Sequence, residues 1–356
     1  MKYAFMLHLM KPKDLAEVSP IINYIPDKVL EAWLRRTSPK KLSYIRGVQA
    51  KTGETDEGWF VLCPLTAKQI MGGLPEEEVI QKIVDTANFA KDLGAEVIGL
   101  GALTAIPGNK GIEIAKRVDM TVTTGNTYTA VTALKAAENA AELLDINLKN
   151  ATVSVVGATG SIGGVCARVM AKDFSKVNIV GRNQERLEKL GEQMKEDTEV
   201  EIFTDVSKGI KDADIVITVT SAIDSVIDAN AIKSGAVVCD VARPRDVAKE
   251  VAQKRNDVLI IEGGVIKVPG KMDTGGYRFG GGLPEGRAYA CMSETMMLGL
   301  ANKKENFSLG PDLDLDKAEE IWELGQKFGF EIDGFRSFEK LLTEEQIESV
   351  KKNIKK

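Results

Sequence analysis

Short runs of valine and isoleucine alternate with longer helical stretches from residue 151 onward. The runs are TVSVVG, VNIVG, ADIVITVT, AVVCDVA and VLIIEG, and helical segments separate most of them. Strands that are apolar at nearly every position are typical of a parallel sheet covered by helices on both faces. The pattern therefore predicts an α/β fold whose larger part is a Rossmann-like domain built on a parallel sheet.

The first 125 residues show a mixed α/β pattern instead. Apolar or alternating runs predict strands at Tyr3–Leu9, Leu42–Ala50 and Gly58–Cys63. A helix is predicted from Pro75, which three acids follow, to Gly94, because proline is favoured at the first helical position and glycine just past the last.

A chain of 356 residues exceeds what one hydrophobic core usually holds, so more than one domain is expected. We predict an N-terminal α/β substrate domain at 1–125 and a Rossmann-like nucleotide-binding domain at 126–285. A C-terminal helical segment at 286–356, with helices expected at 285–301 and 314–330, is predicted to pack back on these domains.

The stretch TVSVVGATGSIGGVCARVMA is the most specific motif in the sequence. A strand ends in glycine, and two further glycines follow in GxxGxxG spacing before a helix begins. Glycine permits a tight turn and close approach to a pyrophosphate, whose charge the helix N-terminus favours. A purely structural glycine turn is the alternative. The predicted cofactor-binding residues here are Gly157, Ala158, Thr159, Gly160, Ser161, Ile162 and Gly163.

The end of the second strand indicates which dinucleotide binds. NAD-binding folds usually place an acid there for the ribose hydroxyl, but here VNIV is followed by Gly181, Arg182 and Asn183, with no acid at that point. Arg182 is placed to pair with a 2′-phosphate, and Asn183 can add a hydrogen bond, so NADPH is the expected cofactor. A solvated arginine at a helix start is the alternative. Thr220 and Ser221, after the fourth strand, are expected beside the nicotinamide.

Composition and net charge indicate the compartment of the protein and the partners that it does not bind. The net charge of −5 disfavours nucleic acid and anionic membranes as partners of the molecule as a whole. The four cysteines are widely spaced, which is typical of a reducing compartment. No run approaches the roughly 20 apolar residues of a membrane span. A cytoplasmic protein without a transmembrane segment is expected. The single histidine, His8, lies in an apolar strand pattern and is expected to be structural.

With these segments in view, the chain resembles the cyanobacterial long-chain acyl-[acyl-carrier-protein] reductases. The resemblance extends over nearly the whole length and is carried by LEAWLRRTSP, IGLGALTAI, TTGNTYTA, VVGATGSIG, GRNQERL, IEGGVI, YACMSETMML and NFSLG. It implies NADPH-dependent reduction of a long-chain fatty acyl thioester to a fatty aldehyde through a covalent acyl-enzyme. The implied nucleophile is the cysteine of YAC, Cys291. The stretch CDVARPRDV also looks like a segment of the glutamyl-tRNA reductases, whose N-terminal nucleophile motif this chain lacks.

The resemblance also implies partners. The acyl group would arrive on acyl carrier protein or coenzyme A, and an aldehyde-consuming enzyme is a possible partner. Acyl carrier protein is acidic, and RRTSPKKLSYIR supplies a basic docking segment with Arg35, Arg36, Lys40, Lys41 and Arg46. An ordinary solvated charged face is the favoured alternative.

The residues around Cys291 do not decide between two roles for it, a small buried hydrophobic residue or a nucleophile. The predicted helix places it two turns from the start, with Arg287 on its face to lower the thiol pKa and Glu294 to oppose that effect. The segment MSET, at 292–295, is expected to set the substrate range. Cys63 is the only plausible rival nucleophile.

Oxyanion donors are expected in the glycine runs at 263–264 and 280–282, with Lys267 or Thr274 as side-chain donors. Two other functions stay open. One is a shikimate-dehydrogenase-like oxidoreductase that acts on a small carbonyl compound without a covalent intermediate. The other is a protein that binds NADP without catalysis.

Overall fold

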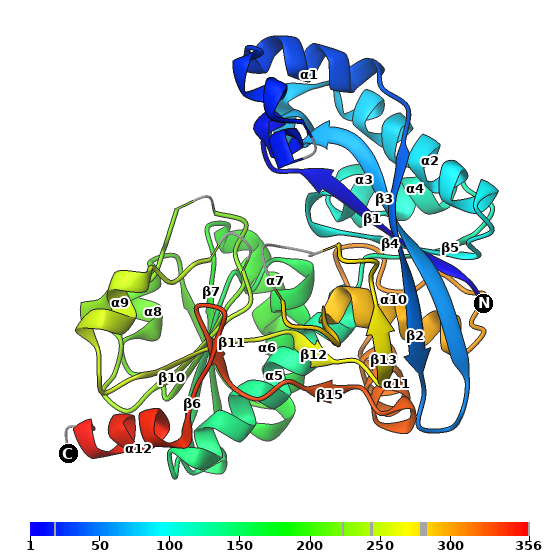
Figure 1. The fold of residues 1–356 in the computed structure, drawn as a ribbon. Helices are drawn as coiled ribbons and strands as arrows, with labels where there is room; N and C mark the ends of the chain where they lie inside the picture. The colour runs from blue at the N-terminus through cyan, green and yellow to red at the C-terminus, as the bar shows by residue number, and fades with distance from the viewer. Residues whose placement is uncertain (18, 223, 243–244, 278–282, 355–356) are drawn as a thin grey trace. The chain divides into compact units, whose positions relative to one another are not determined.

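The computed structural model describes all residues except 18, 223, 243–244, 278–282 and 355–356 (Figure 1). The chain forms two compact units, and each is discontinuous in sequence. Unit 1 comprises residues 1–125, 267–311 and 323–331, and unit 2 comprises residues 126–266, 312–322 and 332–356. Residues 267–285, assigned from the sequence to the nucleotide-binding domain, lie in unit 1. The predicted C-terminal segment 286–356 is divided between the two units.

Unit 1 is built on a six-stranded mixed sheet. Strands β3, β1, β4 and β5 are parallel neighbours, while β2 and β13 continue the sheet in antiparallel pairing. The carboxyl ends of the parallel strands therefore lie along one edge. In spatial order the strands are β13 (Gly270–Asp273), β2 (Lys40–Gln49), β3 (Thr55–Thr66), β1 (Tyr3–Leu9), β4 (Val97–Leu100) and β5 (Thr121–Thr123).

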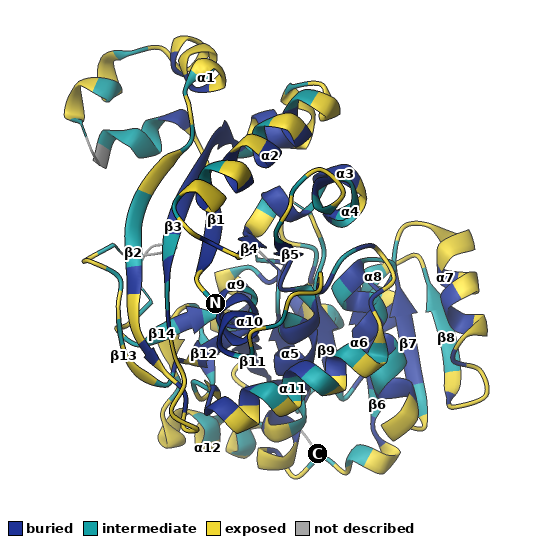
Figure 2. Cartoon of the chain, turned by 90° about the vertical axis from the view of Figure 1, so that its right-hand side faces the viewer, coloured by how far each residue is buried: buried dark blue, intermediate teal, exposed yellow. Residues whose placement is uncertain are grey.

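Helices cover both faces of this sheet. Helix α2 (Glu76–Asp92) forms a core with alternate strand residues such as Met6. Helix α10 (Ala290–Leu300) packs on β1, β3 and β4 and is buried along almost its whole length (Figure 2). The close approach of α10 requires glycine at position 99, because a Cβ there would lie 2.2 Å from Oγ1 of Thr295.

The remaining elements of unit 1 are short. Helix α1 is amphipathic, with Leu30 and Leu34 buried. The elements are η1 (Pro12–Glu17), η2 (Pro20–Tyr24), α1 (Asp27–Arg36), η3 (Gln69–Gly73), η4 (Ala102–Ala105), α3 (Pro107–Lys110), α4 (Ile112–Ala115) and β14 (Arg287–Tyr289).

Unit 2 contains a doubly wound sheet. Its six parallel strands lie in the order β8-β7-β6-β9-β10-β11, which in sequence order is 3-2-1-4-5-6, the order of dinucleotide-binding folds. The strands are β6 (Thr152–Val156), β7 (Lys176–Val180), β8 (Glu199–Phe203), β9 (Ile215–Thr218), β10 (Val237–Asp240) and β11 (Leu259–Glu262), with β16 (Arg336–Ser337) and β17 (Lys340–Leu341) added antiparallel at the edge.

Both faces of this sheet are buried, as the valine and isoleucine runs predict. Val155 and Ile217 belong to a core with α5 (Asn126–Leu143) and α6 (Ser161–Asp173). Val156 and Val216 belong to a second core on the opposite face. The other helices of unit 2 are α7 (Gln184–Glu192), α8 (Val206–Ile210), α9 (Lys249–Lys254) and α12 (Glu344–Asn353), with short turns η5 (Leu148–Asn150) and η6 (Ala229–Ala231).

Three elements lie where the chain passes between the units, namely β12 (Val265–Lys267), α11 (Leu315–Phe328) and β15 (Glu331–Ile332). Across the described part of the chain, every helix is too short or too polar to cross a membrane.

Candidate functional site

The loop after β6 has the geometry of a dinucleotide-binding turn. Gly157 has a φ of +86°, and its carbonyl accepts a hydrogen bond of 2.9 Å from the N–H of Gly160, the N-cap of α6. A Cβ on Gly163 would lie 2.3 Å from the Gly157 oxygen. Gly157 and Gly163 are therefore required by this turn, and the three glycines together leave space for a ligand at the start of a 13-residue helix. This space fits a pyrophosphate.

This loop lies at the point where the strand order reverses, between β6 and β9. A Cβ on Gly157 would approach the carbonyl oxygen of Val219 to 2.6 Å, so the loops that follow the two strands are adjacent. Ligands of doubly wound sheets bind in this crevice. Among the predicted residues, the structure brings Gly157–Gly163 and Thr220 together at this edge.

The structure assigns Thr220 a partner that the sequence analysis missed. Its hydroxyl and its N–H both donate to the carboxylate of Asp246, the latter at 2.8 Å, and Asp246 also accepts from the Thr218 hydroxyl at 2.6 Å. Asp246 is fully buried. Thr220 therefore shapes the loop, while Ser221 is exposed. The second acid of CDVARPRDV, Asp246, was the signal in the sequence for this partner.

Arg182 and Asn183 follow β7, whose residue Val180 is in register with Val156 of β6. They therefore lie at the same edge as the glycine loop. Arg182 is exposed, and within the described residues its side chain makes no ion pair. The side-chain oxygen of Asn183 accepts from the Arg186 N–H at 2.9 Å and caps α7. Asn183 thus has a structural role, which leaves Arg182 as the phosphate candidate.

Cys291 occupies the first turn of α10, not its third. The helix begins at Ala290 with Tyr289 as its N-cap, because residues 287–289 form β14. Arg287 is thus outside the helix, and its Nη1 donates to the Glu285 carbonyl at 3.1 Å. The expected role of Arg287 in lowering the thiol pKa is wrong. Cys291 instead lies among the free N–H groups of a helix N-terminus, which favour a negative charge.

Burial outweighs that helix effect. It raises the pKa of the Cys291 thiol to about 12, and the charge of Glu294 raises it further, while the N–H of Met292 lowers it. The free protein therefore holds Cys291 as a thiol at neutral pH. Cys291 is nevertheless half-buried, whereas the rival Cys63 is fully buried in the core with a pKa also raised to about 12 by burial. Cys166 and Cys239 are fully buried as well.

A buried hydrogen-bond network positions the chain beside Cys291. Gly125 follows β5 with a φ of +73°, and a Cβ on it would lie 2.3 Å from both Cα and Cβ of Cys291. The Gly125 N–H donates to the Thr123 hydroxyl at 3.1 Å, and that hydroxyl donates to the carboxylate of Glu294. The Ser308 hydroxyl donates to the same oxygen at 2.6 Å. Glu294 is fully buried, so it holds the turn against the cysteine.

This network also corrects the expectation for the MSET segment. Ser293, Glu294 and Thr295 are fully buried in unit 1, and the Thr295 hydroxyl donates to the Cys291 carbonyl at 3.1 Å. These side chains stabilise α10 on the sheet. A direct role of the segment in choosing the substrate is therefore not supported.

The expected oxyanion donors are engaged elsewhere or not described. The Thr274 hydroxyl donates to the Tyr277 carbonyl at 2.8 Å. The Lys267 ammonium forms an ion pair with the Glu331 carboxylate, with 3.5 Å between Nζ and Oε2. The glycine run 280–282 lies outside the described residues. The first-turn N–H groups of Cys291 and Met292 are better placed, since both lower the pKa of the Cys291 thiol.

His8 has the structural role expected of it. Its Nε2 accepts from the Leu103 N–H at 3.3 Å, and Nδ1 lies 3.0 Å from the Leu9 carbonyl oxygen. Burial lowers the pKa of the imidazole, so the ring is neutral and stabilises the end of β1. Among the described residues, no group of three His, Cys, Asp or Glu side chains has the arrangement of a metal site.

Comparison with known proteins supports the nucleotide-binding assignment. Residues 137–262 match the family model described as Shikimate / quinate 5-dehydrogenase. Aminotransferase PigE of Serratia sp. is 29% identical over 327 residues, which is 90% of this chain but 38% of that protein. The chain thus spans well under half the length of this relative.

Two further relatives are reductases by name. Long-chain acyl-[acyl-carrier-protein] reductase of Synechococcus elongatus is 27% identical over 339 residues, 91% of this chain and 96% of that protein. Glutamyl-tRNA reductase of Methanococcoides burtonii is 28% identical over 192 residues, 52% of this chain and 43% of that protein. The chain is an α/β protein with a Rossmann-like NAD(P)-binding domain and an N-terminal α/β domain, and it has distant similarity to these reductases.

Proposed function

We propose that this protein is an NADPH-dependent reductase that converts a long-chain fatty acyl thioester to a fatty aldehyde through an acyl-enzyme on Cys291. Acyl carrier protein or coenzyme A carries the acyl group in this proposal. The observation that carries it is the half-buried Cys291 in the first turn of α10, at the carboxyl edge of the parallel strands of unit 1. The end-to-end similarity to the Synechococcus elongatus reductase supports it.

The covalent step uses the thiol of Cys291. Its sulfur attacks the thioester carbonyl carbon, a new C–S bond forms, and the bond to the carrier sulfur breaks. The proton lost by Cys291 leaves on the carrier thiol. Because the pKa of Cys291 is raised to about 12, the attacking species is the small fraction of thiolate, which grows about tenfold per pH unit below that pKa. The N–H groups of Cys291 and Met292 are available to stabilise the oxyanion.

The glycine loop of unit 2 holds the cofactor in this proposal. Gly157, Gly160 and Gly163 admit the pyrophosphate, and Arg182 pairs with the 2′-phosphate that distinguishes NADPH from NADH. When bound there, NADPH supplies the hydride for reduction of the acyl group. Release of the aldehyde leaves the thiolate of Cys291, which takes up a proton from solvent to return to the thiol.

The activity is tested by following NADPH consumption and aldehyde formation with palmitoyl thioesters of coenzyme A and of acyl carrier protein. Cys291→Ala should abolish aldehyde formation, while the matched Cys63→Ala, at a core cysteine, should retain it if the protein folds. Aldehyde formation by Cys291→Ala would overturn the acyl-enzyme. A preference for one carrier identifies the natural donor.

A shikimate-dehydrogenase-like activity is the alternative, favoured by the family match over residues 137–262. That match covers the nucleotide-binding domain and excludes Cys291. Oxidation of small hydroxy acids with NADP, retained in Cys291→Ala, would support this alternative. NADPH binding with neither activity would indicate a non-catalytic protein.

A further inference from the structure

Large apolar side chains are exposed on α1 and on the η2 turn that precedes it in unit 1. Val29 and Trp33 lie one helical turn apart, so they form one stripe, while Leu30 and Leu34 of the same helix are buried. The helix therefore carries a second apolar stripe that no described residue covers. The exposed side chains are Ile21 at 66%, Tyr24 at 88%, Val29 at 56% and Trp33 at 54%.

Unpaired cations border these side chains. Among the described residues, Lys28, Arg36, Lys40 and Lys41 are exposed and form no ion pair, in contrast to Arg35, which is held by Glu78. Residues 11–41 contain seven lysines and arginines and four acids, although the whole chain has a net charge of −5. This segment is therefore net positive, although the whole chain is net negative. Within a Debye length of about 10 Å the local charge decides which partner is attracted.

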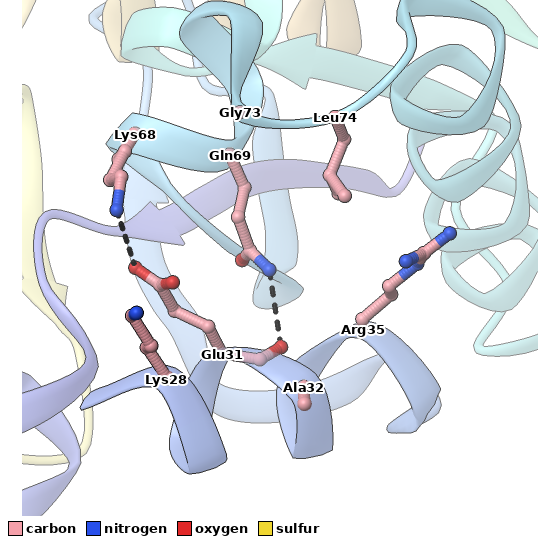
Figure 3. A pocket seen from close by; sticks show the side chains of 8 residues that line it. All are labelled: Lys28, Glu31, Ala32, Arg35, Lys68, Gln69, Gly73 and Leu74. Atoms are coloured by element: carbon pink, nitrogen blue, oxygen red, sulfur yellow. Dashed lines mark hydrogen bonds and ion pairs between the residues drawn. The ribbon is translucent and has the colours of Figure 1, made fainter. Parts of the chain in front are cut away.

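A pocket of about 290 Å³ lies on the other side of α1, between that helix and η3 (Figure 3). Its lining includes the cations Lys28, Lys68 and Arg35 and one carboxylate, Glu31, which is 3.9 Å from the Lys68 ammonium. Because Arg35 is paired with Glu78 and Lys68 with Glu31, Lys28 is the lining cation that has no ion-pair partner among the described residues, and it supplies one positive charge for a phosphate group. An apolar stripe and a cationic pocket therefore flank the same helix.

We propose that this surface, called here the α1 surface and comprising η2, α1 and residues 37–41, binds peripherally to a bilayer that contains anionic phospholipid. Tyr24 and Trp33 enter the interface between headgroups and acyl chains, and Lys40 and Lys41 contact the headgroups. Tyrosine, tryptophan and lysine in this arrangement are typical of helices that lie on membranes.

The exposure favours a bilayer over a folded acidic protein as the occupant. All four apolar side chains are more than half exposed, and Tyr24 projects at the turn before the helix. Such side chains insert into a fluid surface without needing a matching cavity, whereas a protein partner needs shape complementarity. This inference does not depend on the proposed reaction, although a fatty aldehyde would itself partition into the same bilayer.

The proposal is tested by co-sedimentation of the full-length protein with vesicles of phosphatidylcholine, with and without phosphatidylglycerol. Neither substrate nor NADPH is added, so failure of the reaction and failure of this proposal are distinguishable. Lys40→Gln and Lys41→Gln should each lower the partition coefficient on anionic vesicles about fivefold, since one basic residue at an anionic surface contributes about 1 kcal/mol.

The apolar contribution is tested by Tyr24→Ser/Trp33→Ser, which should lower the partition coefficient at least about tenfold. Leu341→Ser is the matched control, because Leu341 is 57% exposed on β17 of unit 2 and should leave binding unchanged. Acyl chains that carry bromine should quench tryptophan fluorescence in the wild type. Trp33→Phe should remove most of that quenching and keep the binding.

Three results would overturn the proposal. The first is no sedimentation with anionic vesicles, or equal sedimentation with both kinds. The second is a loss of binding in Leu341→Ser as large as that in Tyr24→Ser/Trp33→Ser. The third is unchanged vesicle binding in the α1 variants with a raised KM for carrier-protein substrate only, which would make the surface a protein docking site.

Discussion

Replacement of Glu294 by glutamine tests how the chain is held around the reactive cysteine. The carboxylate of Glu294 accepts hydrogen bonds from the hydroxyls of Thr123 and Ser308, and it is fully buried. Glutamine keeps the shape and one acceptor oxygen but loses the charge. A hydrogen bond to a charged group contributes about 1 kcal/mol more than a neutral one, so two such bonds predict a loss of about 2 kcal/mol in the free energy of unfolding.

The same substitution should make the thiol of Cys291 more reactive. The charge of Glu294 is one cause of the raised pKa of Cys291, so its removal should lower that pKa from about 12. Glu294→Gln therefore predicts a less stable protein with a more reactive cysteine. A general loss of structure would instead expose all four cysteines together.

Two assays measure these effects. Thermal unfolding should show a midpoint about 4–8 °C lower, since 1 kcal/mol corresponds to about 2–4 °C in a domain of this size. Alkylation of the Cys291 peptide, followed by mass spectrometry as a function of pH, should accelerate. Glu323→Gln, at an exposed position in unit 1, is the control and should change neither quantity. An unchanged midpoint with an unchanged alkylation profile would refute the role assigned to Glu294.

Three other outcomes are expected. Acylation of Cys291 should accelerate about tenfold per pH unit from roughly pH 7 to roughly pH 10, because burial raises the thiol pKa to about 12; a plateau near neutral pH in stopped-flow traces would contradict this. Arg182→Ala should weaken NADPH binding about 10–100-fold in fluorescence titrations and leave NADH binding unchanged, and equal losses would remove its assignment to the 2′-phosphate. Burial raises the pKa of Asp56 to about 7, so between about pH 4 and about pH 7 the carboxyl is ionised in the unfolded chain but protonated in the folded protein, and the wild type loses stability as the pH rises through this range. In urea unfolding, the stability of Asp56→Asn relative to the wild type should therefore increase over this range and no further above it, and a constant difference would contradict the raised pKa.

The nucleotide-binding half was predictable because its signals are local. The strand, glycine turn and helix around Gly157 are contiguous, and the backbone of the turn itself requires Gly157 and Gly163. The buried strands could be recognised because both faces of a parallel sheet demand apolar residues. The sequence shows that Asn183 is a polar residue just before a helix. It does not show that the side chain caps the helix instead of contacting the cofactor.

The surroundings of Cys291 could not be predicted in the same way. Helix α10 begins at Ala290 because residues 287–289 form a strand, and no proline or capping side chain marks that boundary. Glu294 contacts Thr123, from which it is separated by 171 positions along the chain, so no local pattern connects the two. The return of residues 267–311 to unit 1 likewise depends on packing between distant segments.

The exposed stripe on α1 was also hidden in the sequence. In DKVLEAWLRR the apolar residues Val29, Leu30, Trp33 and Leu34 read as one broad face. Only the structure separates them into a buried pair and an exposed pair. Similarly, Arg35 and Arg36 are adjacent and chemically alike, but Arg35 is neutralised by Glu78 while Arg36 is not.

The most direct test of the central claim is intact mass measurement after the protein is mixed with palmitoyl-coenzyme A in the absence of NADPH. A single added palmitoyl group is expected, located on Cys291 by peptide mapping, absent from Cys291→Ala and released as aldehyde when NADPH is added. An adduct that persists in Cys291→Ala, or aldehyde formation without any adduct in the wild type, would contradict the acyl-enzyme on Cys291.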